Sequence, residues 1–167
     1  MDNQTPATSQ DLIFVKMVLT AWQTQNARVN QLLETLSDEQ LAAETAPGRN
    51  TGFYLLGHSA AVNDRLFTLL GVGERLHPEL DDIFLDNPDK SGKPMPSINE
   101  VKKYWAEINS KLADSFNKMQ PTDWFEKHAA VSEADFAKEP ERNKLNVLIT
   151  RIIHQGYHLG QMAYLKK

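Results

Sequence analysis

Hydrophobic side chains recur at intervals of three and four along four segments of the chain, as they do on one face of an α-helix. The first segment spans about residues 11–36, and Asn26 is the only polar residue in its apolar stripe. That stripe consists of Leu12, Val15, Leu19, Trp22, Val29, Leu33 and Leu36. Its spacing is typical of the seam of a helix bundle. Residues 37–40, Ser-Asp-Glu-Gln, match a capping box and predict a short helix, which the stretch APGRN at 46–50 ends.

The second helical segment spans about residues 51–71 and carries one histidine inside its apolar stripe. The stripe is Leu55, His58, Val62, Leu66 and Leu69. Residues 71–96, rich in glycine and proline, follow it and predict a long connection with a short ordered piece at 79–85. Such a long connection inside a helical bundle is typical of a crossover between two parallel helices.

The third and fourth helical segments are separated by a second irregular region. Ser97 and Glu100 match a capping box that opens the third helix, and Pro121 is expected to end it. Residues 120–140 carry three aromatic side chains that we expect to pack onto the bundle: Trp124, Phe125 and Phe136. The fourth helix is predicted over about 142–165. Because no segment alternates like a strand, the pattern predicts an all-α four-helix bundle over 11–167, preceded by a flexible segment at 1–10.

The fourth helix carries hydrophobic or histidine side chains on two nearly opposite faces. One face has Leu145, Leu148, Ile149, Ile152, Gly156, Leu159 and Ala163, and the other has Val147, His154, His158, Gln161 and Leu165. A helix with two such faces is expected to be buried on both. One face would meet its own bundle and the other a second subunit, with Gly156 and Ala163 allowing close approach. Phe14, Val18 and Ala21 would extend that surface, so we expect a homodimer.

Composition removes several classes of function. The chain has 167 residues, 41% of them hydrophobic and 24% charged, with a net charge of −4 and no basic stripe, so nucleic acid is not an expected partner. It contains no cysteine, which excludes disulfides, thiolate ligands and a cysteine nucleophile. The longest apolar run, 12–19, is interrupted by Lys16 and is too short for a membrane span. The first ten residues do not resemble a signal peptide, and we expect a cytoplasmic protein.

The histidines are the candidate chemistry. His154 and His158 are four residues apart, so their imidazoles lie on one side of a helix and can reach one divalent ion. The alternative for this pair is two amphipathic side chains on a packed helix. His58 favours the metal site over the packed pair, because a buried imidazole in an apolar stripe needs a hydrogen-bond partner or a metal. If the second and fourth helices pack together, three imidazoles make a site that suits zinc or nickel.

Gln161 and the two remaining histidines, His77 and His128, complete the candidate residues. Gln161 follows His158 by three residues and is expected to anchor a water or hold a ligating imidazole, with solvation on the helix surface as the alternative. His77 and His128 lie in predicted loops and are interpreted as solvated and without a role.

Two stretches resemble the DinB-like (YfiT-like) superfamily of four-helix bundles. GRNTGFYLLGHSAAVNDRLF, at 48–67, is similar to the second helix of that family, and HQGYHLGQMAYL, at 154–165, is similar to its fourth helix, written His-x-x-x-His-x-Gly-Gln. The resemblance covers residues 11 to the end. It implies an up-down-down-up topology with a long connection between helices 2 and 3, and metal ligands at His58, His154 and His158. Leu159 and Tyr157 depart from the arginine and histidine that many relatives carry there, without removing a ligand.

Characterised members of that family include metal-dependent transferases and isomerases that use low-molecular-weight thiols, and dimers are common. The resemblance therefore implies a metal-dependent transferase or hydrolase that acts on a small molecule, with no catalytic residue identified beyond the metal ligands. Glu133 and Asp135 are loop carboxylates that could reach the mouth of the site, whereas Asp64 is expected to point away from the stripe of His58. The first alternative is a non-catalytic dimeric bundle that binds a metal or ligand for a structural, sensing or stress-related role. The second is a dimerisation module with fortuitous histidines.

Overall fold

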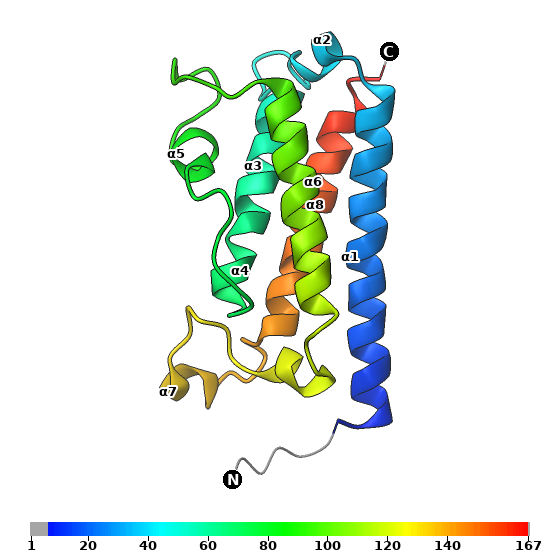
Figure 1. Cartoon of the computed structure of the whole chain (residues 1–167), viewed down its shortest axis with the longest axis vertical. Helices are drawn as coiled ribbons and strands as arrows, with labels where there is room; N and C mark the ends of the chain where they lie inside the picture. The colour runs from blue at the N-terminus through cyan, green and yellow to red at the C-terminus, as the bar shows by residue number, and fades with distance from the viewer. Residues whose placement is uncertain (1–6, 167) are drawn as a thin grey trace.

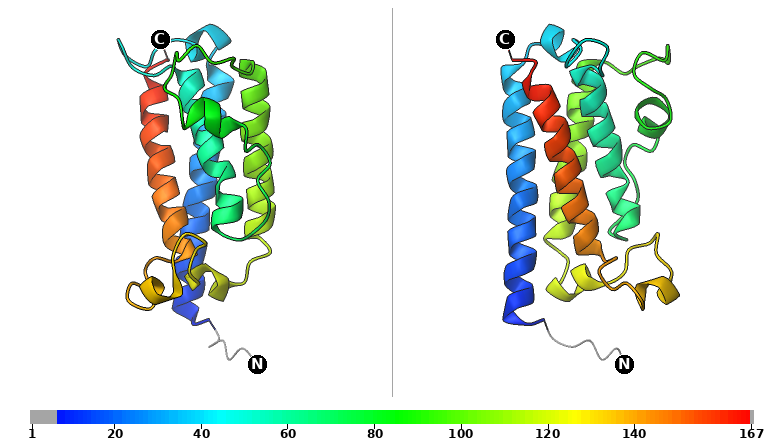
Figure 2. Two further views of the ribbon diagram at one scale, coloured as in Figure 1. Left: turned by 90° about the vertical axis from the view of Figure 1, so that its left-hand side faces the viewer. Right: turned by 180° about the vertical axis from the view of Figure 1, so that it is seen from behind.

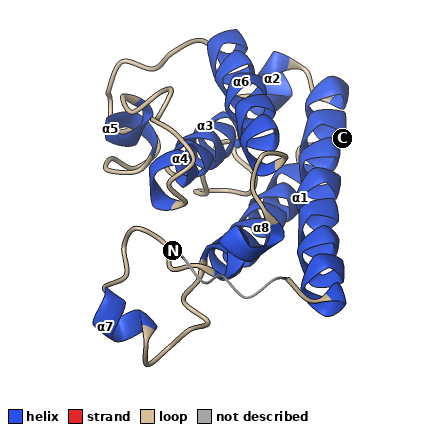
Figure 3. Ribbon diagram, turned by 60° about the horizontal axis from the view of Figure 1, so that its bottom comes forward, coloured by secondary structure: helices blue, strands red, loops and turns tan. Residues whose placement is uncertain are grey.

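Four long helices, α1, α3, α6 and α8, lie side by side in the computed structural model, which describes residues 7–166, and shorter helices occupy the connections (Figure 1). The helices are α1 (Ser9–Thr35), α2 (Asp38–Leu41), α3 (Gly52–Asp64), α4 (Leu66–Leu69), α5 (Leu80–Phe84), α6 (Ile98–Phe116), the 3-10 helix η1 (Pro121–Phe125), α7 (Glu133–Phe136) and α8 (Lys144–Ala163). No strand occurs between residues 7 and 166, and only isolated bridges join Glu44 to Thr51 and Lys127 to Asn143 (Figure 3). The all-α prediction is confirmed.

Capping side chains set where all four long helices begin, and Thr51 caps α3. Thr8 and Asp11 form a reciprocal capping box at α1, Ser97 and Glu100 do the same at α6, and Asn143 caps α8. Because Thr8 is the cap, α1 begins two residues before the predicted start at 11, and residues 9 and 10 of the predicted flexible segment are helical. Residues 1–6 of that segment lie outside the described part of the chain.

The second helical segment ends in the turn that a glycine permits. Gly71 has a φ of +68°, and the amides of Gly71 and Val72 donate to the carbonyls of Thr68 and Phe67. This is a Schellman motif, in which a residue in the left-handed region satisfies the last carbonyls of a helix. The chain then enters the predicted long connection, and the ordered piece expected at 79–85 is α5.

The region between α6 and α8 packs onto the bundle as expected for two of its three aromatic residues. Trp124 is buried, with its ring 5.2 Å from that of Phe116, and Phe125 is packed against the core. Phe136 instead lines a surface pocket. The helix α6 ends at Phe116, before Pro121, because the chain turns into η1.

The helix α8 lies between α1 and α3, and contacts within the same chain cover both of its sides (Figure 2). Gly156 faces α1, where an added Cβ atom would lie 3.3 Å from Nε2 of Gln25. Its close approach is therefore made to α1. Val18, which the sequence analysis placed on a partner surface, is buried in the core of its own chain. Phe14 remains 47% exposed. Both sides of α8 therefore have neighbours in the same chain, α1 and α3, and a second subunit stays a prediction.

A buried polar chain crosses the bundle. The amide of Asn63 on α3 donates to Oδ1 of Asn109 on α6 at 3.0 Å and to Oε1 of Gln155 on α8 at 3.4 Å. Gln155 in turn donates to Oδ1 of Asn26 on α1 at 2.9 Å. One network therefore links all four long helices and fixes their relative register.

None of the helices within 7–166 has the length and apolar content that a membrane span needs.

Candidate metal centre

The histidines of α3 and α8 meet in a single cluster. Nε2 of His154 lies 3.2 Å from Nε2 of His58 and 3.0 Å from Nε2 of His158. Each of the three residues offers a ring nitrogen, and these nitrogens all lie within 4.8 Å of one another. The packing of α3 on α8 brings them together, as the sequence analysis expected.

Hydrogen bonds on the outer side of two rings fix their orientation. Nδ1 of His58 donates to the backbone carbonyl of Phe84 at 3.0 Å, and Nδ1 of His158 donates to Oε1 of Gln161 at 2.7 Å. Gln161 thus holds an imidazole, as expected for that side chain. Phe84, at the end of α5, was missed because a backbone carbonyl gives no signal in residue type.

The donor set fits a metal ion. A neutral imidazole carries one N–H group. Because His58 and His158 each donate a hydrogen bond from Nδ1, the Nε2 atom of each carries a lone pair, which points into the cluster. Lone pairs that face each other repel unless a proton or a cation lies between them. Metal-bound histidines ordinarily donate their other ring nitrogen to a carbonyl or amide oxygen in this way. The cluster could therefore hold a divalent metal through nitrogen ligands.

Burial favours the neutral form of His154 and His158. Desolvation, together with charge repulsion from His158, His58 and Arg151, lowers the pKa of His154 from 6.5 to about 4. Desolvation also lowers the pKa of His158, against the opposing effect of its hydrogen bond to Gln161. Neutral imidazole is the form that binds metal, so His154 and His158 are ready to bind at neutral pH.

Two tyrosines flank the cluster, whereas the nearby acidic groups are engaged elsewhere. The ring of Tyr54 stacks on His58 with centroids 6.4 Å apart, and the ring of Tyr157 meets the edge of His158 at 5.2 Å. Asp64 is buried and accepts hydrogen bonds from Arg75 and from the amides of Leu76 and His77. It points away from the histidines, as predicted.

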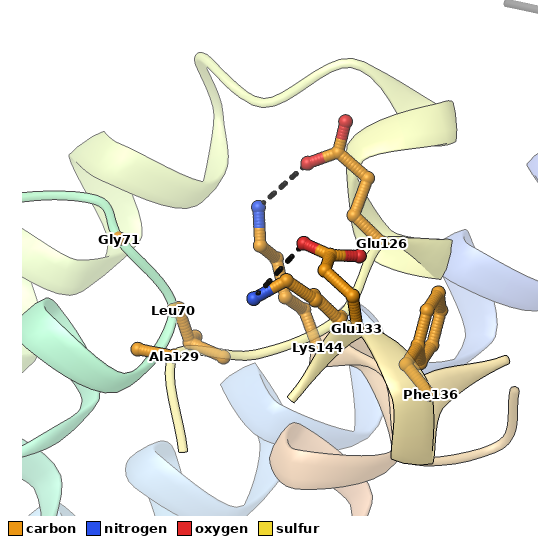
Figure 4. A pocket seen from close by; sticks show the side chains of 8 residues that line it. Leu70, Gly71, Glu126, Ala129, Glu133, Phe136 and Lys144 are labelled. Carbon is orange, nitrogen blue, oxygen red and sulfur yellow. Dashed lines mark hydrogen bonds and ion pairs between the residues drawn. The ribbon is translucent and has the colours of Figure 1, made fainter. Parts of the chain in front are cut away.

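The loop carboxylates line a separate pocket of about 480 Å³ or cap a short helix (Figure 4). Glu133 pairs with Lys127 at 3.4 Å and Glu126 pairs with Lys144 at 2.8 Å across this pocket. Asp135 accepts a hydrogen bond from Ser132 at the start of α7. None of the three clustered histidines lines this pocket, so the structure gives Glu133 and Asp135 roles outside the metal centre.

His77 corrects one interpretation, since it is neither solvated nor free. Its side chain is 15% exposed, its ring lies 4.2 Å from that of Tyr104, and its two nitrogens contact Glu79 at 3.1 Å and Glu107 at 3.0 Å. Burial opposes the charged form, but the two carboxylates prevail and raise the pKa of His77. His128 is half-buried, and desolvation lowers its pKa.

Comparison with known families places the chain. The family model of the DinB superfamily matches residues 21–162, which include α3, most of α8 and all three clustered histidines. No curated protein matches the chain. Since the match extends over most of the sequence, the chain belongs to the DinB superfamily.

Proposed function

We propose that the protein is a metal-dependent enzyme that binds one zinc or nickel ion through His58, His154 and His158 and transfers a group to, or hydrolyses, a small molecule. The observation that supports it is the convergence of three ring nitrogens within 4.8 Å, two of them oriented by outer hydrogen bonds. Membership in the DinB superfamily supports a metal at this place.

A divalent ion on three imidazoles supplies a Lewis acid with an open coordination position, which lowers the pKa of a water or thiol placed there. The chain itself has no cysteine, so a thiol would come from a low-molecular-weight cosubstrate. The carbonyl of Phe84 and the amide of Gln161 hold two of the rings, and the stacked Tyr54 shields one side of His58.

The proposal includes the up-down-down-up topology of the family. In Figure 1 the chain ascends in α1, descends in α3 and α6 and ascends again in α8, which supports this topology. The segment between α4 and α6, which carries α5, would be its long crossover connection.

The proposal also includes a homodimer. Apolar side chains remain exposed along the outer sides of α1 and α8, which are neighbours in the bundle. They are Leu12, Ile13, Phe14 and Met17 on α1 and Ile153 and Tyr157 on α8, with exposures between 47% and 67%. A second copy would remove this surface from water.

Metal content is the first test. Protein purified without a histidine tag should contain close to one equivalent of a divalent metal by mass spectrometry, and His154→Ala should lose it while His128→Ala retains it. Zinc or nickel should raise the melting temperature of stripped wild-type protein. Absence of metal together with no thermal shift would contradict the proposal.

Turnover separates an enzyme from a metal-binding module. Metal-loaded protein is incubated with low-molecular-weight thiols and a panel of electrophiles that includes epoxides, chlorinated aromatics and maleyl compounds. Turnover that is lost in His154→Ala supports the enzyme. Metal binding with no turnover across the panel favours the non-catalytic dimeric bundle.

A further inference from the structure

A stripe of side chains continues from the metal centre toward a second pocket. On α8, Arg151 precedes His154 by three residues and His158 by seven, so all three project from one side of the helix. On α3, Arg65 follows His58 by seven residues, and its helical backbone, with φ −62° and ψ −18°, keeps the register into α4. The helices α3 and α8 pack together, so both stripes run from the histidines to a pair of arginines.

These arginines line a pocket of about 600 Å³. Its lining comprises Arg65, Thr68, Leu69, Arg75, Asp81, Ala129, Ala130 and Arg151. Three guanidinium groups therefore border the pocket against one lining carboxylate, that of Asp81. The pocket of Figure 4 differs, because each of its lysines has a glutamate of its own.

Arg151 has no partner in the described part of the chain. Its Nε atom is buried without a hydrogen bond, and the side chain forms no ion pair with any residue of 7–166. Burial and the nearby charge of Arg65 lower the pKa of its guanidinium, so it is held where positive charge is disfavoured. Arg151 is partly buried, and a charge that is partly withdrawn from water without a counter-ion is ordinarily paired or hydrogen-bonded.

The other two arginines are fixed in place by carboxylates. Arg75 donates to Asp64 through Nε and to Asp81 through both terminal nitrogens, so each of its three nitrogens has a carboxylate partner. Arg65 donates to the same Asp81 through Nε and Nη2, which leaves its Nη1 for another acceptor. The pocket thus combines an unpaired guanidinium with a second one that is held beside it.

We propose that Arg151, assisted by Arg65, binds the oxyanionic group of the small-molecule substrate, a carboxylate or a phosphate. A guanidinium matches such a group with two parallel N–H donors. One helical turn separates Arg151 from His154 and two turns separate Arg65 from His58, which puts the anion about 5 to 10 Å from the metal centre along the helices. The inference rests on the proposed function for the identity of the ligand as substrate, whereas anion binding itself does not require the metal.

The test is titration calorimetry at low salt on metal-stripped protein, with inorganic phosphate and, separately, malonate as probes. Wild-type protein should bind at least one of them, and Arg151→Met should weaken that binding at least about tenfold. Arg151→Met keeps the apolar stem, and it should melt no lower than wild type without anion, because it removes a partly buried, unpaired charge. Arg49→Met removes an exposed arginine whose side chain has no partner among residues 7–166, and it should bind as wild type does.

Every outcome of the calorimetry either supports or overturns the proposed anion site. Binding of phosphate alone identifies a phosphorylated ligand, and binding of malonate alone identifies a carboxylate; both support the site. Equal affinity in wild type and Arg151→Met, or no binding of either probe by wild type up to about 20 mM, overturns it. Should Arg151→Met fail to fold, Arg151→Lys keeps the charge but loses the fork, and unchanged affinity in that variant also overturns the inference. Loss of metal in His158→Gln with anion binding intact is expected. If stripped wild-type protein binds the anion but takes up neither zinc nor nickel when these are added, the proposed function alone is contradicted.

Discussion

Nε2 of His58 lies 3.2 Å from Nε2 of His154, although the two residues are 96 positions apart in the chain. The short separation contributes to the lowered pKa of His154, because positive charge on His58 would oppose positive charge on His154. A divalent ion bound by both nitrogens would accept their lone pairs without protonating either ring. The following predictions concern this relationship and the packing that maintains it.

Gln161→Ala should weaken zinc binding by about 10- to 100-fold, because Oε1 of Gln161 fixes the ring of His158 through a 2.7 Å hydrogen bond. Competition with a chromophoric chelator measures the affinity. Gln23→Ala, which truncates an exposed glutamine on α1, is the control and should bind zinc as wild type does. An unchanged affinity in Gln161→Ala would show that helix packing alone orients His158.

The metal-free protein should lose stability as the pH falls from 6.5 toward 4. His154 has a pKa of about 4 in the folded state and about 6.5 when unfolded, so the unfolded chain binds more protons in this window. The lowered pKa of His158 acts in the same direction, and the raised pKa of His77 acts against it. Urea denaturation in chelator at several pH values measures the slope.

The variant His154→Gln isolates this contribution to the pH dependence. It removes one titrating group and leaves His77 and the carboxylates in place, so its stability should fall less steeply below pH 6.5. Identical slopes for wild type and His154→Gln would contradict the depressed pKa.

Much of the site could be predicted from the sequence, because its ligands are regular on their helices. His154 and His158 share a helix face through their spacing, and His58 is conspicuous as a polar residue in an apolar stripe. Arg151 could have been found by the same reasoning, since it continues the stripe of His154 by three residues. The four long helices followed from the same period of three and four.

The rest depends on contacts that residue types do not specify. The carbonyl of Phe84 reaches His58 because α5 folds back on α3 within the long connection, and no periodicity predicts that return. The two apolar faces of α8 suggested a partner subunit, whereas Gly156 meets Gln25 of α1. A helix pattern shows that a face is buried but not which neighbour buries it.

Gly57→Ala should destabilise the protein by about 1 to 3 kcal/mol, because a Cβ atom there would overlap the buried ring of Phe84. Displacing Phe84 would also loosen its hydrogen bond with His58 and weaken zinc binding. Chemical denaturation and metal titration measure the two effects. Gly160→Ala, in an open position of α8, should instead stabilise by about 0.5 to 1 kcal/mol. A neutral Gly57→Ala would mean that α5 can move without cost.

Asn63→Ala should lower the free energy of unfolding by about 2 to 4 kcal/mol. It removes the donor shared by Asn109 and Gln155, and leaves their buried oxygens without that partner. Asn99→Ala, on the exposed side of α6, is the control and should stay within about 0.5 kcal/mol of wild type. A loss as small as that of the control would show that water replaces the missing amide.

Met17→Glu should shift the proposed homodimer toward monomer, because it places a charge among the exposed apolar side chains of α1, where Met17 is 63% exposed. Sedimentation velocity over a range of protein concentrations measures the effect, with circular dichroism to establish that the fold is retained. Gln31→Glu adds the same charge at an exposed position further along α1 and should leave the assembly unchanged. A wild-type protein that sediments as a monomer at all concentrations would rule the dimer out, and a dimer insensitive to Met17→Glu would place its interface on another face.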